Sequence, residues 1–148
     1  MNMNQNVLIS LFVSASLWVS AVQSAEDVVV IVNADNTQSV SKQQIKNIYA
    51  DITAAWSDGE QITVFHLPVD DDAREVFSQA IFGESAEKQA AAELNRKITN
   101  TIKNPSKTKS ANLVKKMVKR DPKAIGYIPK SSLGASKGLR VVLTLQSP

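Results

Sequence analysis

Three consecutive aspartates are the residues whose type and spacing could most readily support binding chemistry. Asp70, Asp71 and Asp72 stand where a helix is expected to begin. Carboxylates at such a place accept hydrogen bonds from free helix amides and oppose the positive end of the helix dipole. They could also bind a cation, although calcium loops space their carboxylates at alternate positions and add a distal glutamate. A helix cap is therefore the first interpretation of this run, a residual anion-binding loop is the second, and a metal site is the third.

His66 is the single histidine of the chain, and it stands at the end of a strand-like run. A protonated imidazole could donate to an anion, whereas a lone histidine at a strand end is more often a surface residue. No Ser-His-Asp set or paired-carboxylate arrangement is recognisable. The chain also has no cysteine that could supply a thiolate nucleophile or metal ligand. We therefore expect neither an enzyme nor a bound cofactor.

The net charge of +3 hides a division along the chain. Residues 26–93 hold 13 acids and 4 bases, whereas residues 94–148 hold 13 bases and 1 acid. This basic half could be a solvated surface, or it could contact anionic lipid heads, a polyanion or an acidic protein. Aromatic residues do not interleave with the bases, so a nucleic acid is not the expected partner. The densest basic stretch consists of Lys103, Lys107, Lys109, Lys115, Lys116, Lys119, Arg120 and Lys123.

The first 25 residues are typical of a secretory signal peptide. The run from Val7 to Val22 is apolar apart from serines, and small residues follow it up to Ala25. We expect residues 1–25 to be removed on export to the periplasm, which leaves residues 26–148 as one domain without a stable membrane span. An uncleaved membrane anchor is the alternative, because about 20 apolar residues can cross a bilayer.

Strand-like and helix-like segments alternate through the remaining chain. Residues 27–33, 61–67, 124–128 and 139–145 are expected strands, and the unbroken apolar run of the first is typical of a strand buried on both faces of a parallel sheet. Ser41 and Gln44 form a capping box at the start of the first expected helix. The inward residues of the four expected helices are Ile45, Ile48 and Tyr49; Val76, Phe77, Ala80 and Ile81; Ala90, Ala91, Leu94 and Ile98; and Leu113, Val114, Met117 and Val118. This alternation predicts an α/β fold.

Three motifs, in this order, resemble periplasmic phosphate-binding proteins of ABC transporters, which belong to the type II periplasmic-binding-protein superfamily. They are the turn from Tyr49 to Trp56, the helix start Arg74-Glu75-Val76-Phe77, and the strand Pro122-Lys123-Ala124-Ile125-Gly126-Tyr127. The resemblance implies an α/β fold with a mixed, mostly parallel sheet and helices on both faces. The family has two lobes with the ligand between them, and this chain corresponds to a single lobe.

The resemblance also implies where a phosphate or another small anion would bind, and this loop departs from the family. The positions of the family's Ser-Gly-Thr loop are taken by Asp71, Asp72 and Ala73, and the family's upstream arginine falls near Leu67 beside His66. The candidate ligand-binding residues are His66, Asp70, Asp71, Asp72, Ala73 and Arg74. Carboxylates in place of hydroxyls would repel an anion.

Two functions follow from this reading of the sequence. The first is an exported solute-binding-like protein, related to phosphate receptors, that binds phosphate or another small anion weakly. The second is a cell-envelope protein that kept the fold, lost the phosphate site and contacts an envelope protein or transporter through its basic half. Trp56 and Tyr127 are expected to pack the turn and the sheet rather than to stack on a ligand.

Overall fold

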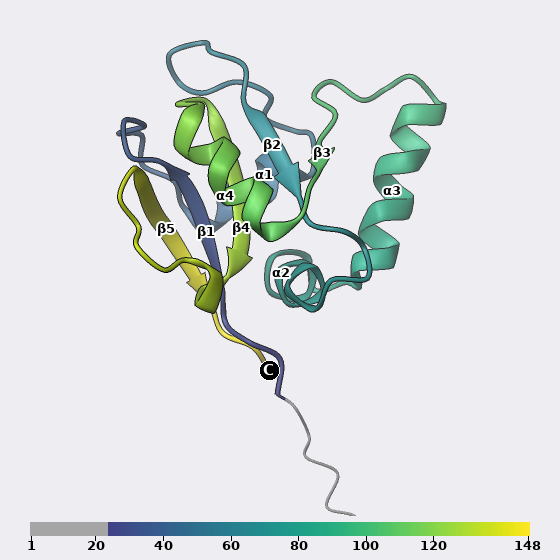
Figure 1. The fold of residues 1–148 in the computed structure, drawn as a ribbon. Helices are drawn as coiled ribbons and strands as arrows, with labels where there is room; N and C mark the ends of the chain where they lie inside the picture. The colour runs from purple at the N-terminus through teal and green to yellow at the C-terminus, as the bar shows by residue number, and fades with distance from the viewer. Residues whose placement is uncertain (1–23) are drawn as a thin grey trace, which may run out of the picture.

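The computed structural model describes residues 24–148, which fold around one five-stranded sheet (Figure 1). The strands are β1 (Val28–Asn33), β2 (Thr63–His66), β3 (Lys107–Thr108), β4 (Ala124–Pro129) and β5 (Leu139–Leu145). The helices are α1 (Lys42–Tyr49), α2 (Asp72–Phe82), α3 (Ala86–Ile98) and α4 (Ala111–Arg120), and a short 3-10 turn covers Lys130–Ser132. The predicted signal peptide lies almost wholly outside the described residues.

The sheet has the strand order β3-β2-β4-β1-β5. β2 pairs in parallel with β3 and β4, whereas β1 pairs antiparallel with β4 and β5. Four strands therefore run in one direction and β1 alone runs against them, which confirms a mixed, mostly parallel sheet. The prediction for the first strand was half right. β1 is buried along its whole length, yet both of its neighbours are antiparallel. Burial on both faces follows from helices covering both faces, and it does not fix strand direction.

Helices cover both faces of the sheet, as adjacent residues of β4 show. A Cβ atom on Gly126 would lie 2.4 Å from Val114 Cγ1, so this glycine lets α4 approach one face closely. The next residue, Tyr127, points to the opposite face and stacks on Phe77 of α2 with ring centroids 3.9 Å apart. Figure 1 shows α4 in front of the sheet and α1 behind it.

The start of α1 forms as the sequence predicts. The Ser41 hydroxyl accepts a hydrogen bond from the Gln44 amide, and the Gln44 side chain accepts one from the Ser41 amide. This reciprocal pair satisfies two amides that a helix start would otherwise leave free. Ile45, Ile48 and Tyr49 are all buried beneath the helix. The capping-box prediction is confirmed.

The predicted inner face of α3 is wrong. Leu94 is 56% exposed and Ile98 is 75% exposed, because α3 packs against α2 and stands away from the sheet (Figure 1). Leu113 in α4 is also 47% exposed, while Val114 and Val118 fill the interior. Apolar spacing identified both helices, but it could not tell that α3 packs chiefly against α2 and leaves Leu94 and Ile98 exposed.

Two further observations complete the fold. The loop before α4 contains the two-residue strand β3, which the polar sequence between Asn104 and Ser110 gave no reason to expect. Among residues 24–148, no helix combines the length and the hydropathy needed to cross a bilayer.

Candidate functional site

The six candidate residues lie in three different places. Asp70, Asp71, Asp72 and Ala73 line one cavity, which we call the acidic cavity. Arg74, together with Asp70, lines a second one, the Arg74 cavity. His66 is buried and lines neither cavity. The fold thus gathers four of the candidates around one space and directs the basic residue elsewhere.

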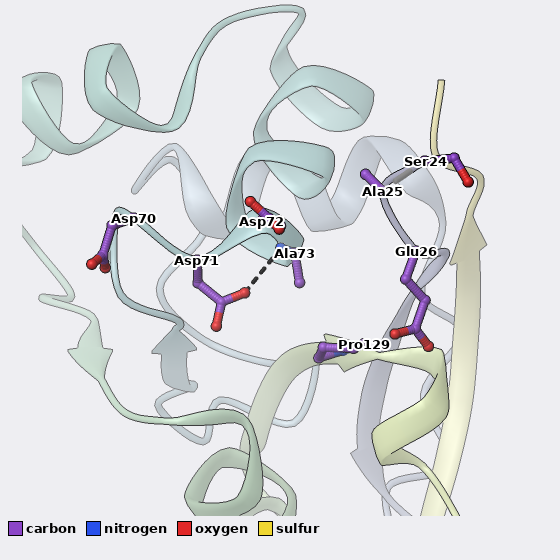
Figure 2. A pocket seen from close by; sticks show the side chains of 8 residues that line it. All are labelled: Ser24, Ala25, Glu26, Asp70, Asp71, Asp72, Ala73 and Pro129. Atoms are coloured by element: carbon purple, nitrogen blue, oxygen red, sulfur yellow. Dashed lines mark hydrogen bonds between the residues drawn. The ribbon is translucent and has the colours of Figure 1, made fainter. Parts of the chain in front are cut away.

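The acidic cavity has a volume of about 570 Å³ and lies between the N-terminal end of α2, the segment entering β1 and the end of β4 (Figure 2). Four acidic residues line it, with Glu26 on the side opposite the aspartates (Figure 2), where its carboxylate accepts hydrogen bonds from Ser131. No lysine, arginine or histidine of the described residues lines it. Its field therefore favours cations over anions. The lining residues are Glu26, Asp70, Asp71 and Asp72, with Ser24, Ala25, Ala73 and Pro129 between them.

The aspartate run caps α2. Asp71 is the N-cap residue, and its Oδ1 atom accepts the Ala73 amide at 2.9 Å (Figure 2). The backbone oxygen of Asp71 accepts the amide of Arg74, also at 2.9 Å. The first turn thereby uses within the protein the amides that hold an anion at an open helix N-terminus. The capping interpretation is confirmed.

The carboxylates would also act on an anion directly. At an effective dielectric constant near 20, two unit charges about 5 Å apart repel by about 3 kcal/mol. Asp70 and Asp72 are exposed, so solvent and salt reduce their share. Asp71 is half-buried and accepts the hydrogen bond of the Ala73 amide. Solvent and salt therefore screen its repulsion of an anion less than they screen that of Asp70 and Asp72.

Arg74 points away from the acidic cavity and holds the end of β2. Its side chain is buried, with only 4% of the residue exposed, and its Nη1 atom donates to the Leu67 carbonyl at 2.8 Å. Its Nε atom has no hydrogen-bond partner among the described residues. The Arg74 cavity, of about 400 Å³, separates this guanidinium from Lys97 and Glu93 of α3. Arg74 does not line the acidic cavity, and of the carboxylates around that cavity only Asp70 also lines the Arg74 cavity.

His66 is buried, so its interpretation as a surface residue is wrong. Its Nδ1 atom lies 2.8 Å from the Tyr127 hydroxyl, and its ring packs edge-on against Tyr49 at 4.8 Å. Burial, followed by the positive charge of Arg74, lowers the pKa of His66 to about 3. The imidazole is therefore neutral at pH 7 and cannot give a positively charged donor to an anion.

Glu93 is a member of this region that the sequence reasoning missed. Its carboxylate lies 3.9 Å from His66 Nε2 and accepts hydrogen bonds from Lys97 at 2.8 Å and Ser106 at 2.7 Å. Burial alone would raise the pKa of Glu93, but these hydrogen bonds and the nearby charges bring it below its usual value. The spacing of Glu93 and Lys97 on one helix was the available signal, yet nothing local linked them to the end of β2.

Packing accounts for the two aromatic residues that the motifs singled out. The Trp56 indole N–H donates to the Lys123 carbonyl at 2.9 Å and ties the turn to the segment before β4. Tyr127 is fully buried between His66 and Phe77. Within residues 24–148, no three His, Cys, Asp or Glu side chains are grouped so that they could hold a metal ion.

Comparisons with known proteins agree with this fold. A family model described as a PBP superfamily domain matches residues 24–144. No curated protein matches the chain. An ABC-type phosphate transport receptor from Vibrio cholerae is similar, with a TM-score of 0.59 and 16% identity, over 80% of this chain and 47% of the receptor.

Two other solved structures give the same result. A protein assigned as a phosphate ABC transporter substrate-binding protein from Clostridium perfringens, with bound phosphate, has a TM-score of 0.59 and 17% identity, over 80% of this chain and 46% of its own. A protein assigned as a phosphate-binding protein from Planctomyces limnophilus has a TM-score of 0.60 and 17% identity, over 80% of this chain and 42% of its own. The chain therefore spans less than half the length of each of these three structures.

Proposed function

Because the chain belongs to the PBP superfamily, we propose that it is a solute-binding-like protein of the cell envelope that binds phosphate or another small anion only weakly. The three similar structures are phosphate receptors by name, which supports a binding role rather than catalysis. The neutral, buried His66 supports the same conclusion, since a catalytic base must reach its substrate.

One observation carries the proposal of weak binding. The Asp71 carboxylate accepts a hydrogen bond from the Ala73 amide at 2.9 Å. This bond lies at the helix terminus where the family resemblance implies phosphate binding. A phosphate would have to displace the Asp71 carboxylate from the Ala73 amide and would then be bound next to that negative charge. We expect a dissociation constant well above about 10 mM.

Thermal unfolding with and without 10 mM phosphate tests this proposal, with sulfate as the matched anion. A ligand present at about 100 times its dissociation constant adds about 2.7 kcal/mol, which raises the melting temperature of a domain of this size by several degrees. We expect a rise of less than one degree for the natural chain, since about 10 mM phosphate would then be well below the dissociation constant. The variant Asp70→Asn/Asp71→Ser/Asp72→Asn should show a larger, phosphate-specific rise. A rise of several degrees in the natural chain would contradict the proposal.

We also propose the periplasm as the location, on the strength of the export signal expected in residues 1–25 and the relation to substrate-binding proteins. The N-terminal sequence of protein recovered from a periplasmic extract tests this. It should begin close to Glu26. An intact Met1 in the membrane fraction would indicate the uncleaved anchor instead.

A second candidate function is a partner-binding protein of the envelope that no longer uses an anion. The observation that favours it is the division of charge, since 13 of the 17 basic residues lie in residues 94–148 and none of the 17 lines the acidic cavity. An envelope protein or a transporter could contact this basic half. Chemical cross-linking in intact cells, with and without the basic residues of α4, would separate the two candidates.

A further inference from the structure

We propose that the exposed face of α4 binds the anionic phosphate headgroups of a lipid membrane. This surface lies on the side of the sheet opposite α2, and its residues take no part in the acidic cavity. The inference therefore stands whether or not the protein binds phosphate. We call this surface the basic face and define it by Leu113, Lys116, Lys119 and Arg120.

The fold fixes the orientation of the basic face. Val114 and Val118 are fully buried and seat α4 against β4, where Gly126 leaves room for them. Residues three and seven positions apart share one side of a helix, so Leu113, Lys116 and Arg120 form a single outward ridge. All three are exposed.

The positive charges of the basic face are not neutralised within the described part of the chain. Ion pairs there involve Lys88, Lys97, Lys123 and Lys130, but none involves Lys116, Lys119 or Arg120. The helix itself contains no acidic residue. Asp121, which follows it, turns its carboxylate to the backbone amide of Lys123 at 2.9 Å.

The adjoining loop extends the same charge. A Cβ atom on Gly138 would lie 3.3 Å from Cε of Lys119, so this side chain runs along the loop that precedes β5. The same loop carries exposed Lys137. Lys115 lies beside the ridge, where its ammonium donates to the Ser132 carbonyl at 3.0 Å. The cluster thus continues beyond the helix instead of ending at its edge.

A membrane surface fits these features better than a nucleic acid does. Leu113 places an apolar side chain, 47% exposed, at one end of the ridge of cations. At a lipid interface such a side chain enters the headgroup layer while the ammonium and guanidinium groups contact phosphates. α4 has no aromatic residue on which a base could stack. The acidic α2 terminus on the far side would orient the protein with its basic face towards an anionic surface.

Co-sedimentation with vesicles tests the proposal. The full chain is mixed with vesicles of phosphatidylcholine, or of phosphatidylcholine with phosphatidylglycerol, and the readout is the ratio of the two partition coefficients. The apolar run from Val7 to Val22 carries no charge and is common to every variant, so the ratio isolates the electrostatic contribution. The ratio should be well above one at low salt and should fall as salt is added.

The decisive variant is Lys116→Glu/Arg120→Glu, and its matched control is Lys42→Glu/Lys46→Glu. The control changes the net charge equally, on exposed residues of α1 at the other face of the sheet. Each basic residue near an anionic membrane contributes about a fivefold change in partitioning, so the first variant should lose more than about tenfold and the control less than about twofold. Leu113→Ser should lower partitioning to both kinds of vesicle. The milder Lys116→Gln and Arg120→Gln variants give a graded series if the double reversal does not fold.

Three results would overturn the proposal. The first is equal partitioning to neutral and anionic vesicles at low salt. The second is an equal loss in the α4 variant and the α1 control, which would mean that only net charge matters. The third is binding of soluble polyphosphate chains through Lys116 and Arg120 without vesicle binding, which would identify a soluble polyanion as the partner.

Discussion

The N-terminal end of α2 and the outer face of α4 lie on opposite sides of one sheet and differ in charge and in anchoring. The α2 end is acidic and closed, because Asp71 uses its own carboxylate to cap the helix. The α4 face is basic and open. Its N-cap residue, Ser110, makes no side-chain capping bond, and its outer lysines have no acidic partner among residues 24–148.

The anchoring of the two helices differs as well. α2 is fixed through Phe77, which stacks on Tyr127 within a buried group that includes Tyr49 and His66. α4 is fixed by two valines against a glycine of β4. The comparison teaches that a chain can keep the family's fold while one helix terminus changes its charge. The resemblance assigns anion binding to the α2 terminus, but the carboxylates there repel an anion.

Removing the aromatic anchor of α2 should have the largest effect. Phe77→Ala empties a fully buried site, and such substitutions cost about 3–5 kcal/mol. Val118→Ala under α4 removes less buried volume and should cost about 1–3 kcal/mol. Urea unfolding measures both. Equal losses would contradict the contrast in anchoring, and Phe77→Leu serves as the conservative control.

Acidification should destabilise the α2 side through His66. Its folded-state pKa is about 3, below the unfolded value near 6.5, so the unfolded chain binds the proton first as the pH falls. Stability is thus complete above about pH 6.5 and declines below it, by about 2 kcal/mol between pH 7 and pH 5. Unfolding at several pH values checks this. His66→Gln should lack the decline in this window, and an unchanged decline would assign it to another group.

The two helix caps should respond differently to alanine. Asp71→Ala removes the hydrogen bond to the Ala73 amide and should cost about 1 kcal/mol. Ser110→Ala at the start of α4 removes no such bond and should cost less than about 0.5 kcal/mol. Melting temperatures of the two variants, measured at one pH, provide the comparison. A larger loss for Ser110→Ala than for Asp71→Ala would reverse the expected order of the two caps.

The smallest effect is expected on α3, where the sequence pattern misled. Leu94→Ser should change stability by less than about 0.5 kcal/mol, because this leucine is mostly exposed. Val114→Ser, at a fully buried position, should cost several times more. If Leu94→Ser destabilised the protein as strongly, α3 would have to bury its apolar side as the spacing predicted.

The sequence predicted most of the fold because the relevant signals were local. The Ser41–Gln44 capping box depends on neighbours within a few residues, and the strand runs and the motifs around Trp56 and Tyr127 can be recognised from short stretches of sequence. The antiparallel placement of β1 was missed because burial of a strand carries no information about direction. The exposed α3 was missed because apolar spacing cannot show which element is available to pack against.

The candidate site was predictable only in part, for a similar reason. The aspartate cap follows from three adjacent residues and the helix that they begin. The burial of His66, the turning of Arg74 to the Leu67 carbonyl and the approach of Glu93 depend on contacts between separate elements. Glu26 joins the acidic cavity only because the segment entering β1 passes the end of α2.

Calorimetric titration of phosphate into the natural chain tests the central claim most directly. The account predicts no measurable heat of binding at micromolar to low-millimolar phosphate, because the cap and carboxylates at the α2 terminus weaken binding beyond this range. The Asp70→Asn/Asp71→Ser/Asp72→Asn variant in the same cell would show whether removing the carboxylates restores binding. Saturable micromolar binding by the natural chain would contradict the account and would indicate that the acidic cavity is a phosphate site.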